Sequence, residues 1–139
     1  MENENPMSVF AQIALVVLLL QQVNPQSPVN DTPLKTVEQF KATLDRGDLA
    51  GLCPLMAEED ASGPLKRIHY EEMQRSLENL MTMWRSQRFI FGAVELGTGK
   101  QANQANVRVE VPSLSQRIKF TLLKFGNAWY IFDMEIYFK

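Results

Sequence analysis

Residues 116–138, with the sequence QRIKFTLLKFGNAWYIFDMEIYF, decide the fold class. Apolar and polar side chains alternate along both halves of this stretch, and a period of two is typical of a β-strand with one buried face. The dipeptide Gly126-Asn127 separates the halves, and a two-residue loop of this kind closes an antiparallel hairpin. The stretch therefore predicts two long strands, residues 116–125 and 128–138, paired in a hairpin.

Two further strands are predicted upstream of this hairpin. Residues 88–96 and 105–111 also alternate apolar and polar side chains, and they are rich in β-branched and aromatic residues. Residues 97–100 and Pro112-Ser113 have the glycine and proline content of turns. Consecutive strands joined by short turns pair antiparallel, so we expect a four-stranded antiparallel meander.

The apolar pattern before residue 88 is helical rather than alternating. Thr32 followed by Pro33 is typical of a helix start, because the hydroxyl can cap the first turn and proline needs no hydrogen-bond partner there. Apolar residues recur at helical spacing until Arg46-Gly47 ends the helix. A short second helix after Asp48 and a longer third helix over residues 65–85 follow. The sequence therefore predicts an α+β fold with three N-terminal helices packed on a four-stranded sheet.

Composition limits the classes of function. The chain has 139 residues, which suits one domain rather than two. Its 14 Lys and Arg against 16 Asp and Glu give a net charge of −2, so it lacks the basic character of nucleic-acid-binding proteins. Cys53 is the single cysteine and His69 the single histidine, which excludes an intrachain disulfide and a multi-cysteine metal site. We expect no cofactor, no metal and no nucleic-acid partner.

The first thirty residues differ from the rest of the chain. They contain no Lys or Arg, and residues 9–20 are apolar except for Gln12. Residues 24–33 carry three prolines among polar residues, a composition typical of an extended linker. We therefore divide the chain into an apolar N-terminal segment (1–23), a linker (24–31) and a domain (32–139).

The apolar segment has two interpretations. It is a signal peptide or membrane anchor, or it is a helix that packs on the domain or on a partner. A signal peptide normally starts with basic residues, whereas the charged residues here are Glu2 and Glu4, and the apolar run is short for a bilayer span. In the first interpretation residues 7–23 contact the membrane, and the protein is membrane-associated or extracytoplasmic. In the second it is a soluble cytoplasmic protein.

The order of elements and three short motifs resemble the nuclear transport factor 2-like superfamily. The motifs are TPLKTVEQF at residues 32–40, LDRGDL at 44–49 and GNAWYI at 126–131, and the resemblance covers residues 32–139. It implies a cystatin-like cone in which a curved sheet wraps around the helices and leaves a cavity. Relatives use this cavity as a ligand pocket, an active site or a packed core, and many of them pair through the outer face of the sheet.

Catalytic members of such a family need an acid or base inside the cone beside hydrogen-bonding tyrosines. Strict alternation along the last strand turns Asp133 outward and Tyr130 toward the core. His69 has no orienting partner that the sequence places beside it, and a general base needs one. We therefore expect no catalytic residue. The alternative is an isomerase or dehydratase with an acid–base site in the cone cavity.

The outward face of the sheet is the more informative surface. Strict alternation places aromatic and apolar side chains there among charged ones, a mixture typical of protein interfaces. The interface residues that it predicts are Phe89, Phe91, Arg117, Trp129, Ile131 and Tyr137. The expected partner is a second copy of the chain, giving a homodimer, or another protein subunit.

A second candidate site lies in the cone. Tyr70, Met81, Trp84 and Tyr130 are the residues expected to line it for a small apolar ligand. The sequence thus predicts a non-enzymatic binding or assembly domain, an accessory subunit that uses its sheet face for protein association.

Overall fold

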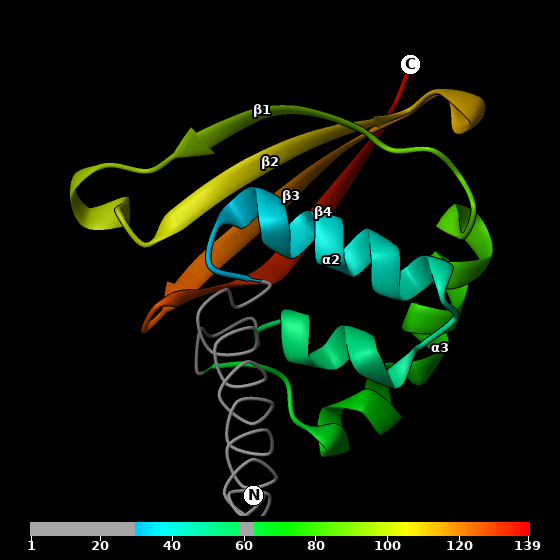
Figure 1. Ribbon diagram of the computed structural model, residues 1–139, viewed down its shortest axis with the longest axis horizontal. Coiled ribbons are helices and arrows are strands. Elements are labelled where there is room, and N and C mark those ends of the chain that lie inside the picture. Colours follow the sequence, from blue (N-terminus) through cyan, green and yellow to red (C-terminus); the bar gives the residue numbers. More distant parts are fainter. Residues whose placement is uncertain (1–29, 59–62) are drawn as a thin grey trace, which may run out of the picture.

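One antiparallel sheet and three helical segments make up an α+β fold, which the computed structural model describes for residues 30–58 and 63–139 (Figure 1). The elements follow in the order α2 (Pro33–Asp45), the 3-10 helix η1 (Ala50–Leu55), α3 (Arg67–Trp84), β1 (Ile90–Leu96), β2 (Gln104–Val111), β3 (Gln116–Phe125) and β4 (Ala128–Phe138). Single 3-10 turns, Gly99–Gln101 and Pro112–Leu114, lie in the two loops that flank β2.

The sheet has the predicted topology. Its strand order is β1-β2-β3-β4, with each pair antiparallel, which confirms the four-stranded meander. The bounds of β3 and β4 are those predicted, β1 begins at Ile90 rather than at residue 88, and β2 begins one residue early at Gln104. The local alternation of side chains was therefore a sufficient signal for the strands.

Helix α2 begins where local chemistry predicts, whereas α3 begins at Arg67 rather than at residue 65 and ends at Trp84. The hydroxyl of Thr32 accepts the N–H of Lys35 at 3.1 Å and caps α2, and Pro33 occupies its first turn. Gly47, with a φ of +75°, takes the left-handed conformation that ends the helix. The short second helix is of the 3-10 type, and the carboxylate of Asp48 accepts the N–H of Gly51 at 3.0 Å.

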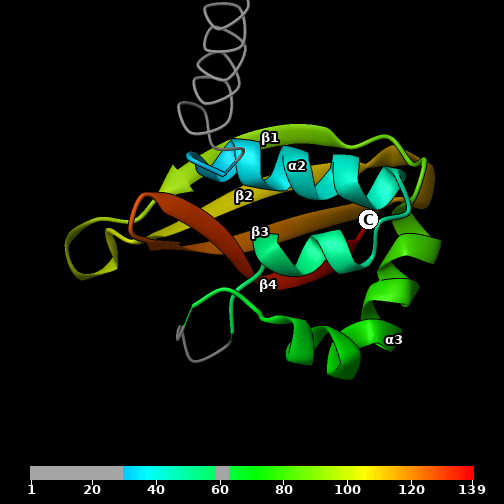
Figure 2. The same cartoon turned by 60° about the horizontal axis from the view of Figure 1, so that its bottom comes forward.

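The described helices lie on one side of the sheet (Figures 1 and 2). Helix α2 lies over the sheet, and α3 stands at the end where β1 begins and brings Trp84 into the core. The centre of the Trp84 ring is 5.7 Å from that of Phe89 and 6.3 Å from that of Phe120. The indole N–H of Trp84 donates to the side-chain oxygen of Gln116 at 2.9 Å. This bond satisfies two polar groups that would otherwise be buried without partners.

Two β-bulges interrupt the edge strands. In β1, Gly92 and Ala93 together face Arg108 of β2, and in β4, Phe132 has no partner between the pairs Leu122–Ile131 and Thr121–Asp133. A bulge bends its strand and shifts the alternation of side chains by one residue.

The bulge at Phe132 corrects one prediction from the sequence. Trp129 and Ile131 were expected on the outward face, but they are buried, with 6% and 0% of their surface exposed. Tyr130, expected in the core, lies between them on the opposite face. After the bulge the alternation agrees with the prediction again, so Asp133 is exposed as expected. The physical reason is that strict alternation assumes a regular strand, whereas Phe132 is an extra residue in β4 that shifts the faces of the residues before it relative to those after it.

Asn30, the first described residue, is hydrogen-bonded to β4. The carbonyl of Asn30 accepts the N–H of Trp129 at 2.8 Å, and its side-chain amide donates to the Trp129 carbonyl at 3.3 Å. The end of the predicted linker therefore contacts β4. The predicted apolar segment, residues 1–23, and residues 24–29 of the linker lie outside the described residues.

Asp45, at the end of α2, is hydrogen-bonded to the segment between α3 and β1. Its carboxylate accepts two bonds from the Lys41 ammonium, at 2.6 and 2.7 Å, and one from the N–H of Ser86 at 2.9 Å. Lys41 is buried, and its ammonium also lies 5.1 Å from the centre of the Phe89 ring. Burial alone would raise the pKa of Asp45, but the hydrogen bonds from Lys41 and Ser86 and the charges of Lys41 and Arg85 lower it below 3.8.

We predict that Asp45→Asn lowers the free energy of unfolding at pH 7 by about 1 kcal/mol, a value that allows for screening of this partly exposed carboxylate. Because folding lowers the pKa of Asp45 below 3.8, its contribution is present above that pH and is lost as the pH falls through the folded value. Urea unfolding of both proteins at pH 7 and in the acid range measures the difference. If the difference in free energy of unfolding between the two proteins stays constant into strong acid, the Asp45 carboxylate does not stabilise the fold in this way.

Candidate functional site

The four residues predicted to line a ligand site in the cone do not meet in the structure. Trp84 is fully buried in the core, and Tyr130 packs on Phe125 with ring centres 5.7 Å apart on the opposite face of the sheet. Tyr70 is half-buried beside η1, and Met81 borders a separate surface pocket on α3. Tyr70 and Met81 also pack against the core that contains Trp84, but the four side chains do not line one common pocket among those of the described residues.

Aromatic rings fill the space between α2 and the sheet. Phe40 and Phe120 have ring centres 5.8 Å apart, and Phe89 lies 6.4 Å from Phe120. The first two are completely buried, and their edge-to-face geometry is that of a close-packed core. A ligand between α2 and the sheet would have to displace these rings.

Phe89 and Phe91 belong to this core side, which corrects their predicted place on the interface. Phe89 is 9% exposed and contacts Trp84, and Phe91 is half-buried opposite Val109, whose side chain faces the helices. The sequence placed both on the wrong face because alternation reports which residues share a face and leaves open which face the helices cover.

His69 and Asp133, the two candidate acid–base groups, lie on different elements. Asp133 is exposed, and its carboxylate accepts the N–H of the next residue, Met134, at 2.9 Å. The imidazole Nε2 of His69 lies 2.8 Å from a carboxylate oxygen of Glu58, and both side chains are half-buried. The expectation that His69 lacks an orienting partner is therefore wrong. An isolated bridge joins Ala57 to Pro64, next to Glu58, and the contact of Glu58 with His69 has no local sequence signal.

A small pocket of about 200 Å³ lies between η1 and the start of α3. Cys53, Arg67 and Tyr70 are among its lining residues. Burial raises the pKa of the Cys53 thiol, so the thiol stays protonated near neutral pH and is a poor nucleophile. The pocket therefore offers one guanidinium and one phenol rather than a reactive cysteine.

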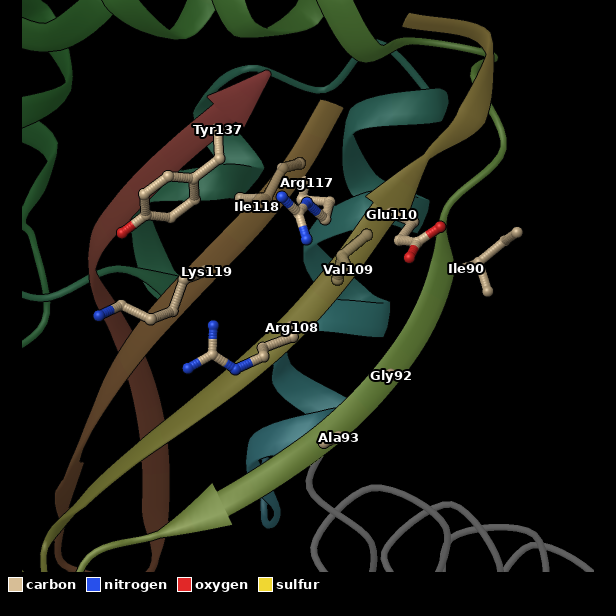
Figure 3. A pocket seen from close by; sticks show the side chains of 10 residues that line it. All are labelled: Ile90, Gly92, Ala93, Arg108, Val109, Glu110, Arg117, Ile118, Lys119 and Tyr137. Atoms are coloured by element: carbon tan, nitrogen blue, oxygen red, sulfur yellow. The ribbon is translucent and has the colours of Figure 1, made fainter. Parts of the chain in front are cut away.

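A hollow of about 490 Å³ lies on the outer face of the sheet, with charged side chains and apolar surface in its lining (Figure 3). It extends across all four strands, because Ile90 of β1, Glu110 of β2, Arg117 of β3 and Tyr137 of β4 are successive cross-strand neighbours. The remaining lining residues are Gly92, Ala93, Arg108, Val109, Ile118 and Lys119.

The bulge in β1 explains why the face is hollow at this point. Beside Arg108 the edge strand presents Gly92 and Ala93, which have no side-chain atoms beyond Cβ. A Cβ on Gly92 would lie 3.3 Å from the carbonyl oxygen of Arg108, a tight contact. Small residues at this bulge thus leave open the space that a larger side chain would fill.

Ion pairs organise most of the charges around the hollow. Arg108 contacts Glu95 at 3.3 Å and Lys119 contacts Glu135 at 3.1 Å. The third pair joins Glu110 to Lys139 at 3.0 Å. These are exposed pairs that give the face a defined charge pattern rather than much stability.

Tyr137 extends this pattern at the edge of the sheet. Its hydroxyl donates to the Glu135 carboxylate at 2.7 Å. This bond raises the pKa of Tyr137 and, together with the bond from Lys119, lowers the pKa of Glu135. The phenol therefore stays neutral and the carboxylate charged at neutral pH.

Two of the six predicted interface residues lie on this outer face. Arg117 and Tyr137 are both exposed and both line the hollow. Ile90, with 41% of its surface exposed, is a lining residue that the sequence analysis missed. The signal was present, since Ile90 alternates with Phe89 and Phe91, but it was assigned to the wrong face.

No group of His, Cys, Asp or Glu side chains within residues 30–58 and 63–139 is arranged to hold a metal ion. Among the helices of these same ranges, none combines the length and the hydropathy that a bilayer crossing requires. No protein-family model matches the chain, and a search of curated proteins finds no significant match.

Proposed function

We propose that this chain is a non-enzymatic binding or assembly domain that associates with a protein subunit, most simply a second copy of itself, through the outer face of its sheet. The observation that carries the proposal is a face left uncovered by the described helices, on which exposed Ile90 and Tyr137 lie at the two edges of a row of charged side chains (Figure 3). Their exposed fractions are 41% and 46%.

The chemistry of this face suits association. Large apolar and aromatic side chains contribute most of the binding energy of an interface, and charged neighbours set its register. Carboxylates and cations are interspersed around the hollow, so the same face can serve on both sides of a twofold axis. The packed rings on the other side of the sheet favour the outer face over the interior as the binding surface.

The fold proposal that accompanies this function is the nuclear transport factor 2-like cone. Its support is the order of helices followed by a meander, together with bulges in both edge strands, which bend a sheet. A small apolar ligand in the cone would require rearrangement of the core rings, so it is the lesser part of the proposal.

The proposal includes residues 7–23 as the part that contacts a membrane, which would make the domain a membrane-associated or exported accessory subunit. Its support is the apolar run ahead of a proline-rich segment.

A second candidate function is proton-transfer catalysis by an isomerase or lyase. The observation that favours it is the 2.8 Å contact between His69 and Glu58, because a carboxylate can orient an imidazole as a general base. Against it, Asp133 and the tyrosines Tyr130 and Tyr137 lie on the outer face of the sheet, away from this pair.

The association is tested with Tyr137→Ala. We expect the dissociation constant of the dimer to rise by about tenfold or more, because a central aromatic anchor is removed. Leu96→Ala is the matched control, since Leu96 is exposed on the same sheet but outside the hollow. Sedimentation equilibrium measures both. A parent chain that is monomeric at every concentration would refute association with a second copy, and equal effects of the two variants would refute the assigned face.

The membrane role is tested by deleting residues 1–29. We expect the truncated chain to unfold cooperatively in urea, since it retains the hydrogen bonds of Asn30 to β4. The full chain should sediment with membranes and the truncated chain should stay in the supernatant. A full chain found entirely in the supernatant would contradict the membrane role, and loss of cooperative unfolding would contradict the domain boundary.

The His69–Glu58 contact is tested by a double-mutant cycle with His69→Gln and Glu58→Gln. We expect a coupling energy of about 0.5 kcal/mol in urea unfolding, the value of a half-exposed pair. A coupling energy of zero would show that Glu58 does not orient His69, and the second candidate function would lose its support.

A further inference from the structure

One cation in the lining of the outer hollow differs from its neighbours because it has no carboxylate partner in the described part of the chain. Arg108, Lys119 and Lys139 each have a carboxylate within 3.3 Å. Within residues 30–58 and 63–139, the side chain of Arg117 has neither a hydrogen bond nor an ion pair, although Glu110 is its cross-strand neighbour. The carboxylate of Glu110 bonds instead to Lys139. The hollow therefore contains one cation whose five N–H donors have no protein acceptor among the described residues.

Arg117 belongs to the row of lining residues that crosses all four strands. It is on β3, between Glu110 on β2 and Tyr137 on β4, and its side chain projects from the same face as that of Arg108 (Figure 3). A guanidinium presents a planar pair of donors that matches the two oxygens of a carboxylate. The single guanidinium without a protein partner is therefore suited to bind one carboxylate group of a ligand.

The rest of the hollow is suited to an apolar group. The ring of Tyr137 and the side chain of Ile90 border it from the two edge strands, and the β1 bulge opens space beside Arg108. Its volume of about 490 Å³ falls within the range of small-molecule sites. An aromatic ring with a short acidic side chain would place apolar surface in this space and its carboxylate on Arg117.

We propose that the outer hollow is a binding site for a small amphiphilic carboxylate, a molecule with one carboxylate on an aromatic or compact apolar body. Arg117 binds the carboxylate, and the Tyr137 ring and the space at Gly92-Ala93 receive the body. A dianion such as phosphate suits the site less well, because only one cation is uncompensated and the Glu110 carboxylate lies in the same lining.

The test uses the full chain labelled with ¹⁵N and two probes of the same shape, phenylacetate and the neutral phenylacetamide. We expect phenylacetate to produce saturable shifts of the backbone amides of Arg108, Arg117 and Tyr137, and phenylacetamide to bind about tenfold or more weakly, since charge-assisted bonds are lost. Shifts that are equal for the two probes, that map elsewhere, or that are absent at millimolar concentrations would overturn the proposal.

Two variants separate the charge from the space. Arg117→Gln should raise the dissociation constant of phenylacetate by about tenfold or more. Arg75→Gln, which removes one exposed arginine from α3, should leave it unchanged. Ala93→Leu retains every charge but fills the hollow, so it should weaken both probes. Equal effects of Arg117→Gln and Arg75→Gln would show that only net charge matters and would overturn the site.

This site lies on the face proposed for association, but the two ideas can fail separately. The titrations follow amides at the hollow, whereas sedimentation follows the mass of the assembly. If Tyr137→Ala weakens association while phenylacetate does not bind, the carboxylate site is refuted and the proposed function stands. If phenylacetate binds to a chain that is always monomeric, association with a second copy is refuted and the site stands.

Discussion

Packing of the described helices against one face of the sheet is the constraint on which the rest of the structure depends. A strand with one buried face alternates its side chains between the helical side and the outer side, as β2 does along its whole length. The bulge at Phe132 moves Trp129 and Ile131 into the core and returns the later residues of β4 to the expected faces. The bulge at Gly92-Ala93 leaves open the hollow on the other side. Core and candidate site therefore have a common origin in the irregularities of the edge strands.

Polar contacts connect the helices to the sheet where apolar packing alone would leave buried groups without partners. The indole of Trp84 bonds to Gln116, and the buried ammonium of Lys41 bonds to Asp45, whose carboxylate also accepts the N–H of Ser86. Satisfied buried groups of this kind favour one arrangement of the core over its competitors. A rigid core holds the outer face in a defined shape, and a binding surface built on strands needs this support.

The outer face and the core differ in chemistry in a way that bears on function. Completely buried rings such as Phe40 and Phe120 fill the inner side, whereas the outer side carries an open hollow with paired charges and one unpaired guanidinium, that of Arg117 among the described residues. Proton-transfer chemistry would need its acid or base beside a substrate cavity. The hollow on the outer face of the sheet is lined by cations, whereas the His69–Glu58 pair lies on the helical side. The outer hollow and the His69–Glu58 pair therefore lie on opposite sides of the sheet.

The sequence by itself determined the elements whose signals are local: the Gly126-Asn127 hairpin, the Thr32 cap of α2, the four strands and their order. It also identified Arg117 and Tyr137 as residues of the outer face. Only the tertiary structure decided that Phe89 and Phe91 face the helices, that Glu58 reaches His69, and that Arg117 has no acceptor among the described residues. Local signals operate within a few bonds or one turn. The position of a bulge, the face that a helix covers and the partner of a charge depend on segments distant in the chain, so no single stretch of sequence encodes them.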